Sequence, residues 1–214
     1  LPISPFISTY AADESRYQWK SSSENISYVD FSKYFGKYEG SFVLYDLEND
    51  IWSIHDIEHA TLRVAPDSTY KIYDALFGLE EGVITPQDSF IAWNGKNYPF
   101  ETWNSDQTLQ SAMTSSVNWY FQAIDEQLAS NNIRNYIQQI GYGNENVSGR
   151  LSTYWLESSL KISPVEQVKL LTKLQNNSLG FSSENINAVK DAICLSSSDA
   201  GTFYGKTGTG RVDG

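Results

Sequence analysis

The feature that most constrains the fold is a helix that is apolar on almost every side. Residues 68–82 read STYKIYDALFGLEEG, and apolar side chains follow the spacing of one helical face at Ile72, Ala75, Leu76 and Leu79. Aromatic side chains occupy the other side at Tyr73 and Phe77. A helix without a polar face has to be covered by the rest of the chain, so we predict that it is central and buried and that Gly82 ends it.

The first turn of this helix carries the pattern S-x-x-K at Ser68 and Lys71. Residues i and i+3 share a helical face, so the lysine amine can reach the serine hydroxyl. Free N–H groups and partial positive charge at a helix N-terminus would stabilise an oxyanion formed during acyl transfer. The alternative is an N-cap serine followed by a lysine that extends to solvent, but this helix offers little polar surface for such a lysine.

Strand patterns precede helical patterns along the chain, and an extended segment returns near the end. Residues 40–56 alternate around a turn at 48–50 and predict a hairpin, followed by a third extended piece at 61–65. Helices are expected at 107–129, 131–140, 163–176 and 183–195, a loop at 141–155 and an extended stretch at 202–207. This order predicts an α+β fold in which an antiparallel sheet packs against a mostly helical region and the last strand joins the early hairpin. We expect residues 1–39 to be a tether and lead-in, and residues 40–214 to be the folded domain.

Residues 204–210 read YGKTGTG and raise the question of a phosphate-binding loop. The preceding Gly201 stands one residue too close to Gly205 for that loop, and two more glycines follow where a helix should begin. We therefore interpret Lys206-Thr207-Gly208 as an extended segment whose glycine lets a ligand approach the backbone closely.

The ordered set of S-x-x-K, a serine motif and K-T-G resembles the penicillin-recognising serine acyl-enzymes. The serine motif is Ser115-Ser116-Val117, of the form S-x-V, and two further features are Tyr142-Gly143-Asn144 and Trp155. These are similar to the class D β-lactamase branch. The stretches DSTYKIYDALFGL, NYPFETWN and SVNWYF are most similar to the extracellular penicillin-sensor domain of the BlaR/MecR receptors.

The resemblance implies the β-lactamase/penicillin-binding-protein fold and a set of site residues. The catalytic residues would be Ser68 as nucleophile with Lys71, Ser115 and Lys206. Lys206 and Thr207 would hold a substrate carboxylate beside Gly208, and the Thr209 N–H would complete an oxyanion hole with the Ser68 N–H. The resemblance also implies two more strands, a terminal helix and a substrate-binding arginine after residue 214.

The resemblance to class D enzymes implies that Lys71 is carboxylated by carbon dioxide, with no metal or other cofactor. Val117 and Trp155 would then supply a dry surround, and the Trp155 N–H would donate to the carbamate. The competing interpretation is a free amine that acts as the base. The polar neighbours Ser116 and Asn118 fit a dry carbamate pocket less well.

Composition excludes some functions. The net charge of −11 argues against nucleic-acid partners, which need clustered lysine and arginine. The single cysteine, Cys194, lies in helical spacing and is interpreted as a buried apolar residue. His55 and His59 match the zinc-protease pattern H-x-x-E-H, but that pattern needs a helix, and we expect a strand end there.

Three functions remain open. The first is a β-lactam sensor that is acylated by penicillins or cephalosporins and retains the acyl group, and the second is a class D hydrolase that releases it. The third is an aromatic-rich module that binds cell-wall sugar or peptide, because aromatic residues make up 14% of the chain. As a sensor, the chain would belong to a longer receptor with transmembrane helices and a cytoplasmic zinc protease, and would face the outside of a bacterial membrane.

Overall fold

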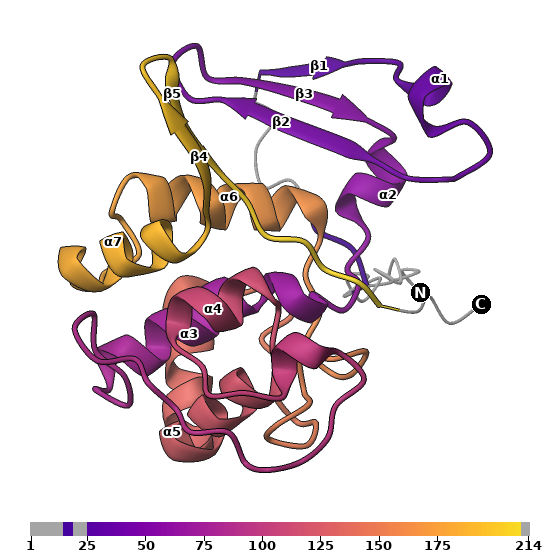
Figure 1. The fold of residues 1–214 in the computed structure, drawn as a ribbon. Coiled ribbons are helices and arrows are strands. Elements are labelled where there is room, and N and C mark those ends of the chain that lie inside the picture. The colour runs from indigo at the N-terminus through magenta and orange to yellow at the C-terminus, as the bar shows by residue number, and fades with distance from the viewer. Residues whose placement is uncertain (1–14, 19–24, 211–214) are drawn as a thin grey trace, which may run out of the picture.

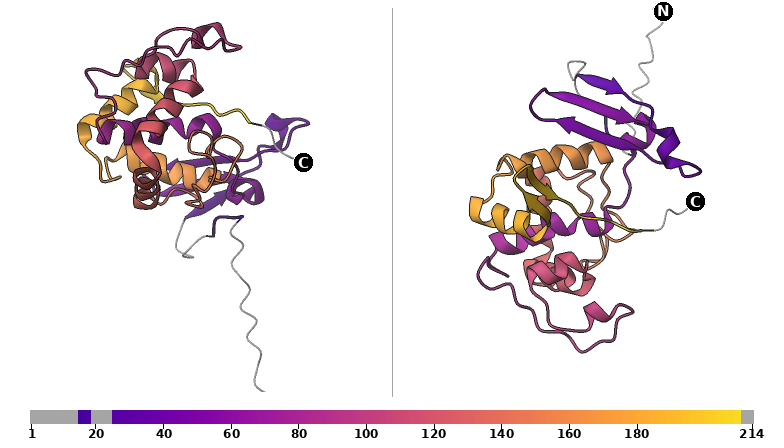
Figure 2. Two further views of the ribbon diagram at one scale, coloured as in Figure 1. Left: turned by 90° about the horizontal axis from the view of Figure 1, so that it is seen from below. Right: turned by 45° about the horizontal axis from the view of Figure 1, so that its top comes forward.

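The structure, a computed structural model, describes residues 15–18 and 25–210. A sheet lies at one end of the molecule, a group of helices lies at the other, and helix α6 (Pro164–Gln175) runs between them (Figure 1). The views of Figure 2 show the same separation of sheet and helices. The predicted α+β architecture, a sheet packed against a mostly helical region, is confirmed.

The early hairpin consists of β2 (Phe42–Asp46) and β3 (Ile51–His55), which pair antiparallel as predicted. The Asp46 side chain accepts hydrogen bonds from two turn N–H groups, and Asp50 takes the left-handed conformation (φ 53°) that closes the turn. A short strand, β1 (Ile26–Tyr28), pairs parallel with β3, so the sheet is mixed rather than purely antiparallel. The inner face buries Trp52 and Ile54 together with Val165 of α6.

The remaining connections around this sheet are short. Helix α1 (Ser32–Phe35) follows β1, so residues before 40 take part in the structure, and the division at residue 39 stays a prediction. Helix α2 (Ile57–Thr61) follows β3. The extended piece predicted at 61–65 is not a regular strand, and it forms only isolated β-bridges, one of which joins Val64 to Ile162.

The predicted central helix is confirmed. A short 3₁₀ turn, η1 (Asp67–Thr69), leads into α3 (Lys71–Glu80), and every residue from Lys71 to Leu79 is buried. Gly82 ends the helix in a left-handed conformation (φ 69°) that favours glycine. The helix packs closely on α5 (Asn118–Ile140), since a Cβ at Gly78 would lie 2.7 Å from Ile124 Cγ2.

The single helix predicted at 107–129 is wrong. Helix α4 (Leu109–Thr114) stops and α5 begins at Asn118, after three residues that are not helical. The short 3₁₀ helix η2 (Glu101–Trp103) lies upstream of α4. Ser116 breaks the helix because its backbone takes a left-handed conformation (φ 53°), which hydrophobic periodicity does not reveal. The predicted boundary near residue 130 appears as a kink inside α5 at Ala129 (φ 60°).

The C-terminal part differs from the prediction in two respects. Helix α7 (Ser183–Ala192) ends before residue 195, and Cys194 is the half-buried first residue of β4 (Cys194–Ser198). Strand β5 (Gly201–Tyr204) pairs with β4 in a separate two-stranded sheet instead of joining the early hairpin. The short turn between the two strands makes this local pairing cheap in loop entropy.

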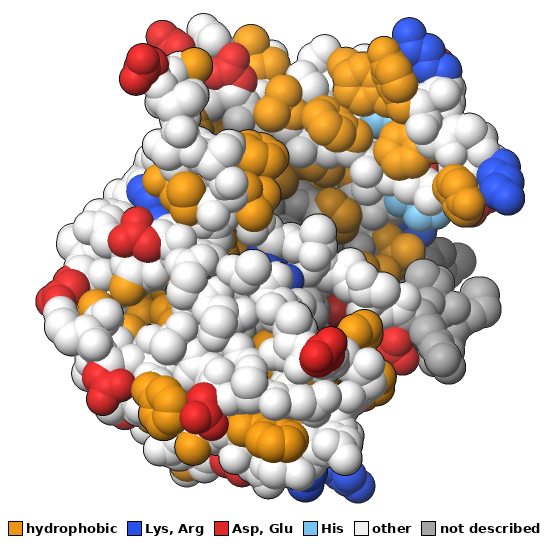
Figure 3. Space-filling view, viewed as in Figure 1, with side chains coloured by type: hydrophobic (Ala, Val, Ile, Leu, Met, Phe, Trp, Pro, Cys, Tyr) orange, Lys and Arg blue, Asp and Glu red, His pale blue; other side chains and the backbone are white. Residues whose placement is uncertain are grey.

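Figure 3 shows hydrophobic side chains gathered over the sheet end of one face. The exposed large hydrophobic residues of this end include Tyr28, Tyr34, Tyr38, Phe42 and Leu44. Within residues 15–18 and 25–210, no helix combines the length and the apolar character needed to cross a bilayer.

Candidate active site at the start of the central helix

Ser68 and Lys71 meet as the S-x-x-K spacing predicts. The Nζ of Lys71 lies 2.6 Å from the Oγ of Ser68, and the serine is only half-buried, so its hydroxyl is open to a ligand. The turn before the helix is fixed by Asp67, whose strained backbone (φ 47°) donates its N–H to the carbonyl of Trp155. An amine in direct contact with a hydroxyl at a helix start is the arrangement that activates a serine nucleophile.

The Lys71 side chain is fully buried. Burial lowers the pKa of this amine to about 7, and the positive charge of Lys206 contributes to the lowering, whereas Asp74 and Asp67 oppose it. Near neutral pH a large fraction of the amine is therefore unprotonated. An unprotonated amine can take the proton of Ser68, which an ammonium cannot do.

The serine motif lies one residue later than the sequence interpretation placed it. Lys71 Nζ lies 3.2 Å from the Oγ of Ser116 and 2.5 Å from the Oδ1 of Asn118. Ser115 is instead the C-cap of α4, and its carbonyl accepts the indole N–H of Trp103. The left-handed backbone at Ser116 turns the chain so that Ser116 and Asn118 face the lysine.

The site motif is therefore S-x-N, Ser116-Val117-Asn118, and Ser115 is outside it. The sequence SSVN at 115–118 fits both S-x-V, which starts at Ser115, and S-x-N, which starts at Ser116. The sequence alone does not distinguish these two registers. Val117 is buried as expected. The side chain that contacts the lysine amine is the amide of Asn118, where an apolar side chain was expected.

The K-T-G segment lies against the start of α3, as expected. Lys206 Nζ lies 3.0 Å from the Oγ of Ser116, and a Cβ at Gly208 would lie 3.1 Å from the carbonyl oxygen of Pro66. Thr207 and Thr209 are exposed beside this contact. The segment thus brings the Lys206 amine to the Ser116 hydroxyl and the backbone at Gly208 to the turn that precedes α3.

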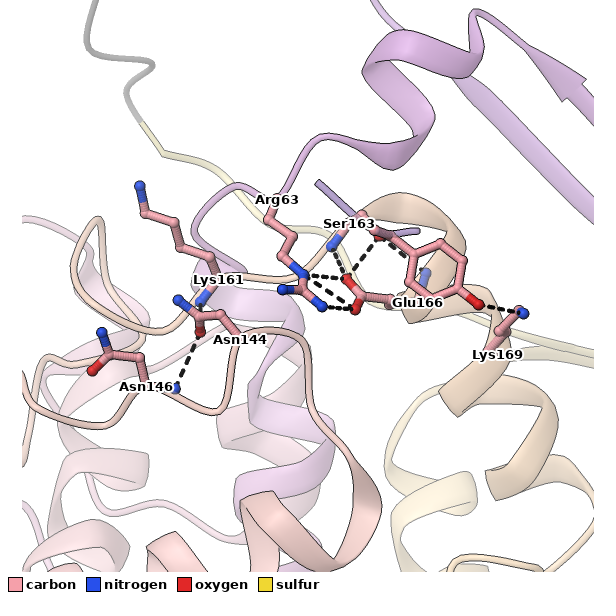
Figure 4. A network of polar contacts seen from close by, with 8 residues as sticks. Arg63, Asn144, Asn146, Lys161, Ser163, Glu166 and Lys169 are labelled. Carbon is pink, nitrogen blue, oxygen red and sulfur yellow. Dashed lines mark hydrogen bonds and ion pairs between the residues drawn. The ribbon is translucent and has the colours of Figure 1, made fainter. Parts of the chain in front are cut away.

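The Y-G-N motif supports the site without contacting Ser68. The Tyr142 ring packs edge-on against the rings of Tyr70 and Tyr73. Asn144 exchanges hydrogen bonds with the backbone of Lys161, and Gly143 lies so close to the Lys161 carbonyl that a Cβ would overlap it. Figure 4 shows Asn144 beside Lys161.

Figure 4 also shows an ion pair next to this motif. Arg63 donates to the Glu166 carboxylate at 2.6 Å, and Glu166 in turn accepts from the N–H and hydroxyl of Ser163 at the start of α6. The pair joins the segment before α3 to α6. Its role is structural, because it holds these two segments together.

Trp155 has a partner that the sequence did not predict. Its indole N–H donates to Asp125 Oδ2 at 2.9 Å, so it is not turned toward Lys71, whose Nζ lies 5.1 Å from the centre of the ring. Tyr154 donates to the other oxygen of Asp125 at 2.9 Å. Asp74 is fully buried nearby, and neither of its oxygens has a hydrogen-bond partner in the described part of the chain. The sequence signal for Asp74 was an acidic residue in the middle of a helix that is apolar on almost every side.

The two histidines make separate contacts. His55 ends β3 and lies near the carbonyl of Val29, whereas His59 lies in α2 with its Nδ1 2.6 Å from Asp56. The segment that follows β3 is a helix rather than a second strand, but Asp56 takes a left-handed conformation between the two histidines and separates their directions. Within the described residues, no group of three potential metal ligands gathers.

The fold and this site define the class of penicillin-recognising serine proteins. A family model described as "Penicillin binding protein transpeptidase domain" matches residues 40–214, and the chain belongs to that family. Its resemblance to the BlaR/MecR sensor domains and to the class D β-lactamases is likewise confirmed.

Three relatives illustrate this position. The chain is 44% identical over 192 residues to the regulatory protein BlaR1 of Bacillus licheniformis, which covers 89% of this chain and 32% of that protein. It is 36% identical over 189 residues to the probable beta-lactamase YbxI of Bacillus subtilis (strain 168), which covers 88% of this chain and 71% of that protein. The solved C-terminal domain of the B. licheniformis BlaR penicillin-receptor matches with a TM-score of 0.86 at 43% identity, covering 90% of this chain and 78% of that chain. The chain spans about a third of the length of the BlaR1 relative.

Proposed function

We propose that this chain is a β-lactam sensor domain that is acylated at Ser68 and retains the acyl group. The observation that carries the proposal is the 2.6 Å contact between Lys71 Nζ and Ser68 Oγ in a buried site faced by Lys206. The amine takes the serine proton as Oγ attacks the lactam carbonyl, and the proton then passes to the lactam nitrogen as its bond to the carbonyl breaks. Lys206 and Thr207 bind the carboxylate of the drug, and the N–H groups of Ser68 and Thr209 receive the oxyanion.

Asn118 favours retention of the acyl group over its hydrolysis. Its Oδ1 lies 2.5 Å from Lys71 Nζ, so the amine is held by an amide at the place where a base would have to activate a water molecule. The residues around Nζ also fit a carbamate poorly. The surrounding Ser116 carbonyl and Asn118 oxygen are acceptors, and the Trp155 N–H is taken by Asp125. We infer that the working base is the free amine.

The alternative is a class D hydrolase, because the Ser68–Lys71 contact would serve both functions. The two differ in the fate of the acyl group. As a sensor, the domain would act within a longer receptor, with penicillins and cephalosporins as ligands outside the cell and membrane-spanning and zinc-protease parts that respond to acylation.

An intact-mass time course with equimolar benzylpenicillin tests the proposal. A lasting mass increase equal to the drug is expected, and Ser68→Ala should show none. Transient labelling with continued consumption of the drug would establish the hydrolase instead. No label in the wild-type protein would exclude both functions and leave a non-covalent binding module.

A further inference from the structure

The two N–H groups that receive the oxyanion come from segments that only packing holds together. Ser68 lies in η1, before the central helix, and Thr209 lies far along the chain, in the K-T-G segment as it runs on to Gly210. Among the residues that the structure describes, neither N–H donates to another group, so both are available to a ligand. The distance between the two segments therefore decides whether both donors can reach one oxygen.

Asp67, the residue before the nucleophile, lies against the end of the K-T-G segment. A Cβ on Gly210 would overlap the Oδ2 atom of Asp67, so the segment approaches this carboxyl group as closely as a glycine allows. On the other side of Thr209, a Cβ on Gly208 would lie 3.1 Å from the carbonyl oxygen of Pro66. Thr209 thus lies between two close contacts with the turn that carries the nucleophile.

A third segment fixes the position of Asp67. Its Oδ1 accepts the N–H of Glu157 at 3.3 Å, and its own backbone N–H donates to the carbonyl of Trp155 at 3.1 Å. The residue is buried, with 7% of its surface exposed. Because both its side chain and its backbone are bound to the loop at 155–157, the carboxyl group cannot move away from Gly210 without breaking these hydrogen bonds.

The contacts of this side chain depend on its shape more than on its charge. Burial raises the pKa of Asp67 above its ordinary value, and the hydrogen bond from the Glu157 N–H opposes this shift. The surroundings therefore disfavour the charged form. What the contacts require is the volume of the side chain and one acceptor oxygen, and an asparagine would supply both.

We propose that Asp67 is a positioning residue that sets the width of the oxyanion hole. Its side chain is a spacer between the loop at 155–157 and Gly210, and it holds the Thr209 N–H at the distance at which this group and the Ser68 N–H reach the same oxygen. Asp67 acts through these two donors and takes no proton in the reaction. This inference rests on the proposed acylation of Ser68 and adds to it the group that keeps the two donors aligned.

Infrared spectroscopy of the acyl adduct tests this role. The domain is acylated with benzylpenicillin that carries carbon-13 at the lactam carbonyl, and the label-sensitive ester C=O band reports the hydrogen bonds that this carbonyl accepts. In Asp67→Ala the band should move to higher wavenumber, and the acylation rate constant should fall about 100-fold, as it does when one oxyanion-hole donor is lost. The Kd of the complex before acylation should change little, because the oxyanion forms only during the reaction.

Three further variants separate positioning from a general loss of structure. Asp67→Asn should recover the wild-type band and most of the rate, because the amide keeps the volume and the acceptor oxygen. Gly210→Ala should move the band in the same direction as Asp67→Ala, because its Cβ pushes the segment away from the same carboxyl group. Asp199 is an exposed aspartate, and Asp199→Ala is the matched control, which should behave as the wild type.

A purely structural role for Asp67 predicts a different result. Asp67→Ala would then unfold at a lower urea concentration, but its acyl adduct would keep the wild-type ester band, and this outcome would overturn the inference. If Asp67→Ala does not fold, an unshifted band in Gly210→Ala overturns the inference in the same way. Unshifted bands in acylated variants overturn this inference alone, whereas the absence of any adduct in the wild-type protein would overturn the proposed function.

Discussion

The Nζ of Lys206 lies 3.0 Å from the Oγ of Ser116, and Ser116 in turn lies 3.2 Å from the Nζ of Lys71. One hydroxyl thus bridges the lysine of the central helix and the lysine of the K-T-G segment. This contact brings three segments that are distant in sequence to one point, and it gives Ser116 rather than Ser115 the place of the second serine.

Ser116→Ala should slow acylation by about 100-fold, because the hydroxyl that connects the two lysines is lost and the proton cannot be passed on. Ser115→Ala is the matched control, since the contacts of Ser115 are made by its backbone, the carbonyl with Trp103 and the N–H with Ser111, and both groups remain in the variant. The rate of labelling by a fluorescent penicillin measures both. Equal losses of acylation rate in the two variants would show that Ser115 belongs to the motif, as the S-x-V interpretation has it.

Acylation should depend on pH through Lys71. The pKa of the amine is lowered to about 7, and the reactive form is the neutral one, so the rate should rise as the pH passes through about 7 and level off above it. Acylation rates at low drug concentration across the pH range measure the inflection in the free protein. A rate that is flat between pH 5 and 9, or that falls over this range, would show that the amine is not the base.

Asn118→Val should shorten the life of the acyl adduct by about tenfold. The valine removes the oxygen that holds Lys71, and it leaves the amine free to act as a base or to add carbon dioxide. Intact-mass decay after removal of free drug measures the lifetime. NMR with carbon-13 bicarbonate should show a carbamate in the variant and none in the wild type, and a carbamate in the wild type would contradict the free-amine interpretation.

Gly143→Ala should lower the free energy of unfolding by more than about 2 kcal/mol, because φ is 50° there and a Cβ would overlap the Lys161 carbonyl. Gly141→Ala is the matched control. Its φ is 69° but no atom lies near a Cβ, so strain alone should cost about 1 kcal/mol. Urea unfolding of both variants gives the difference, and equal losses would show that close packing of Y-G-N is unimportant.

Much of this protein was predictable because the signals were local. The apolar helix at 68–82, the hairpin at 40–56 and the helix from Ser163-Pro164 each follow from periodicity, turn residues or capping within a few residues. The S-x-x-K contact follows equally, since i and i+3 share a face of any helix.

The tertiary structure decided what depends on backbone direction and on distant neighbours. A left-handed Ser116 shifted the second motif by one residue, and a local hairpin separated β5 from the first sheet. Asp125 accepts a hydrogen bond from the indole N–H of Trp155, and Asp74 is buried without a hydrogen-bond partner among residues 15–18 and 25–210. These outcomes depend on the packing of α3 on α5 and on loop conformations, because the charge and hydrogen bonding of a buried group are set by atoms that the sequence places far away. The residues themselves determined that a serine and a lysine would meet, and only the packing around them lowered the pKa of the lysine amine, because the side chains that bury it and the charge of Lys206 come from distant segments.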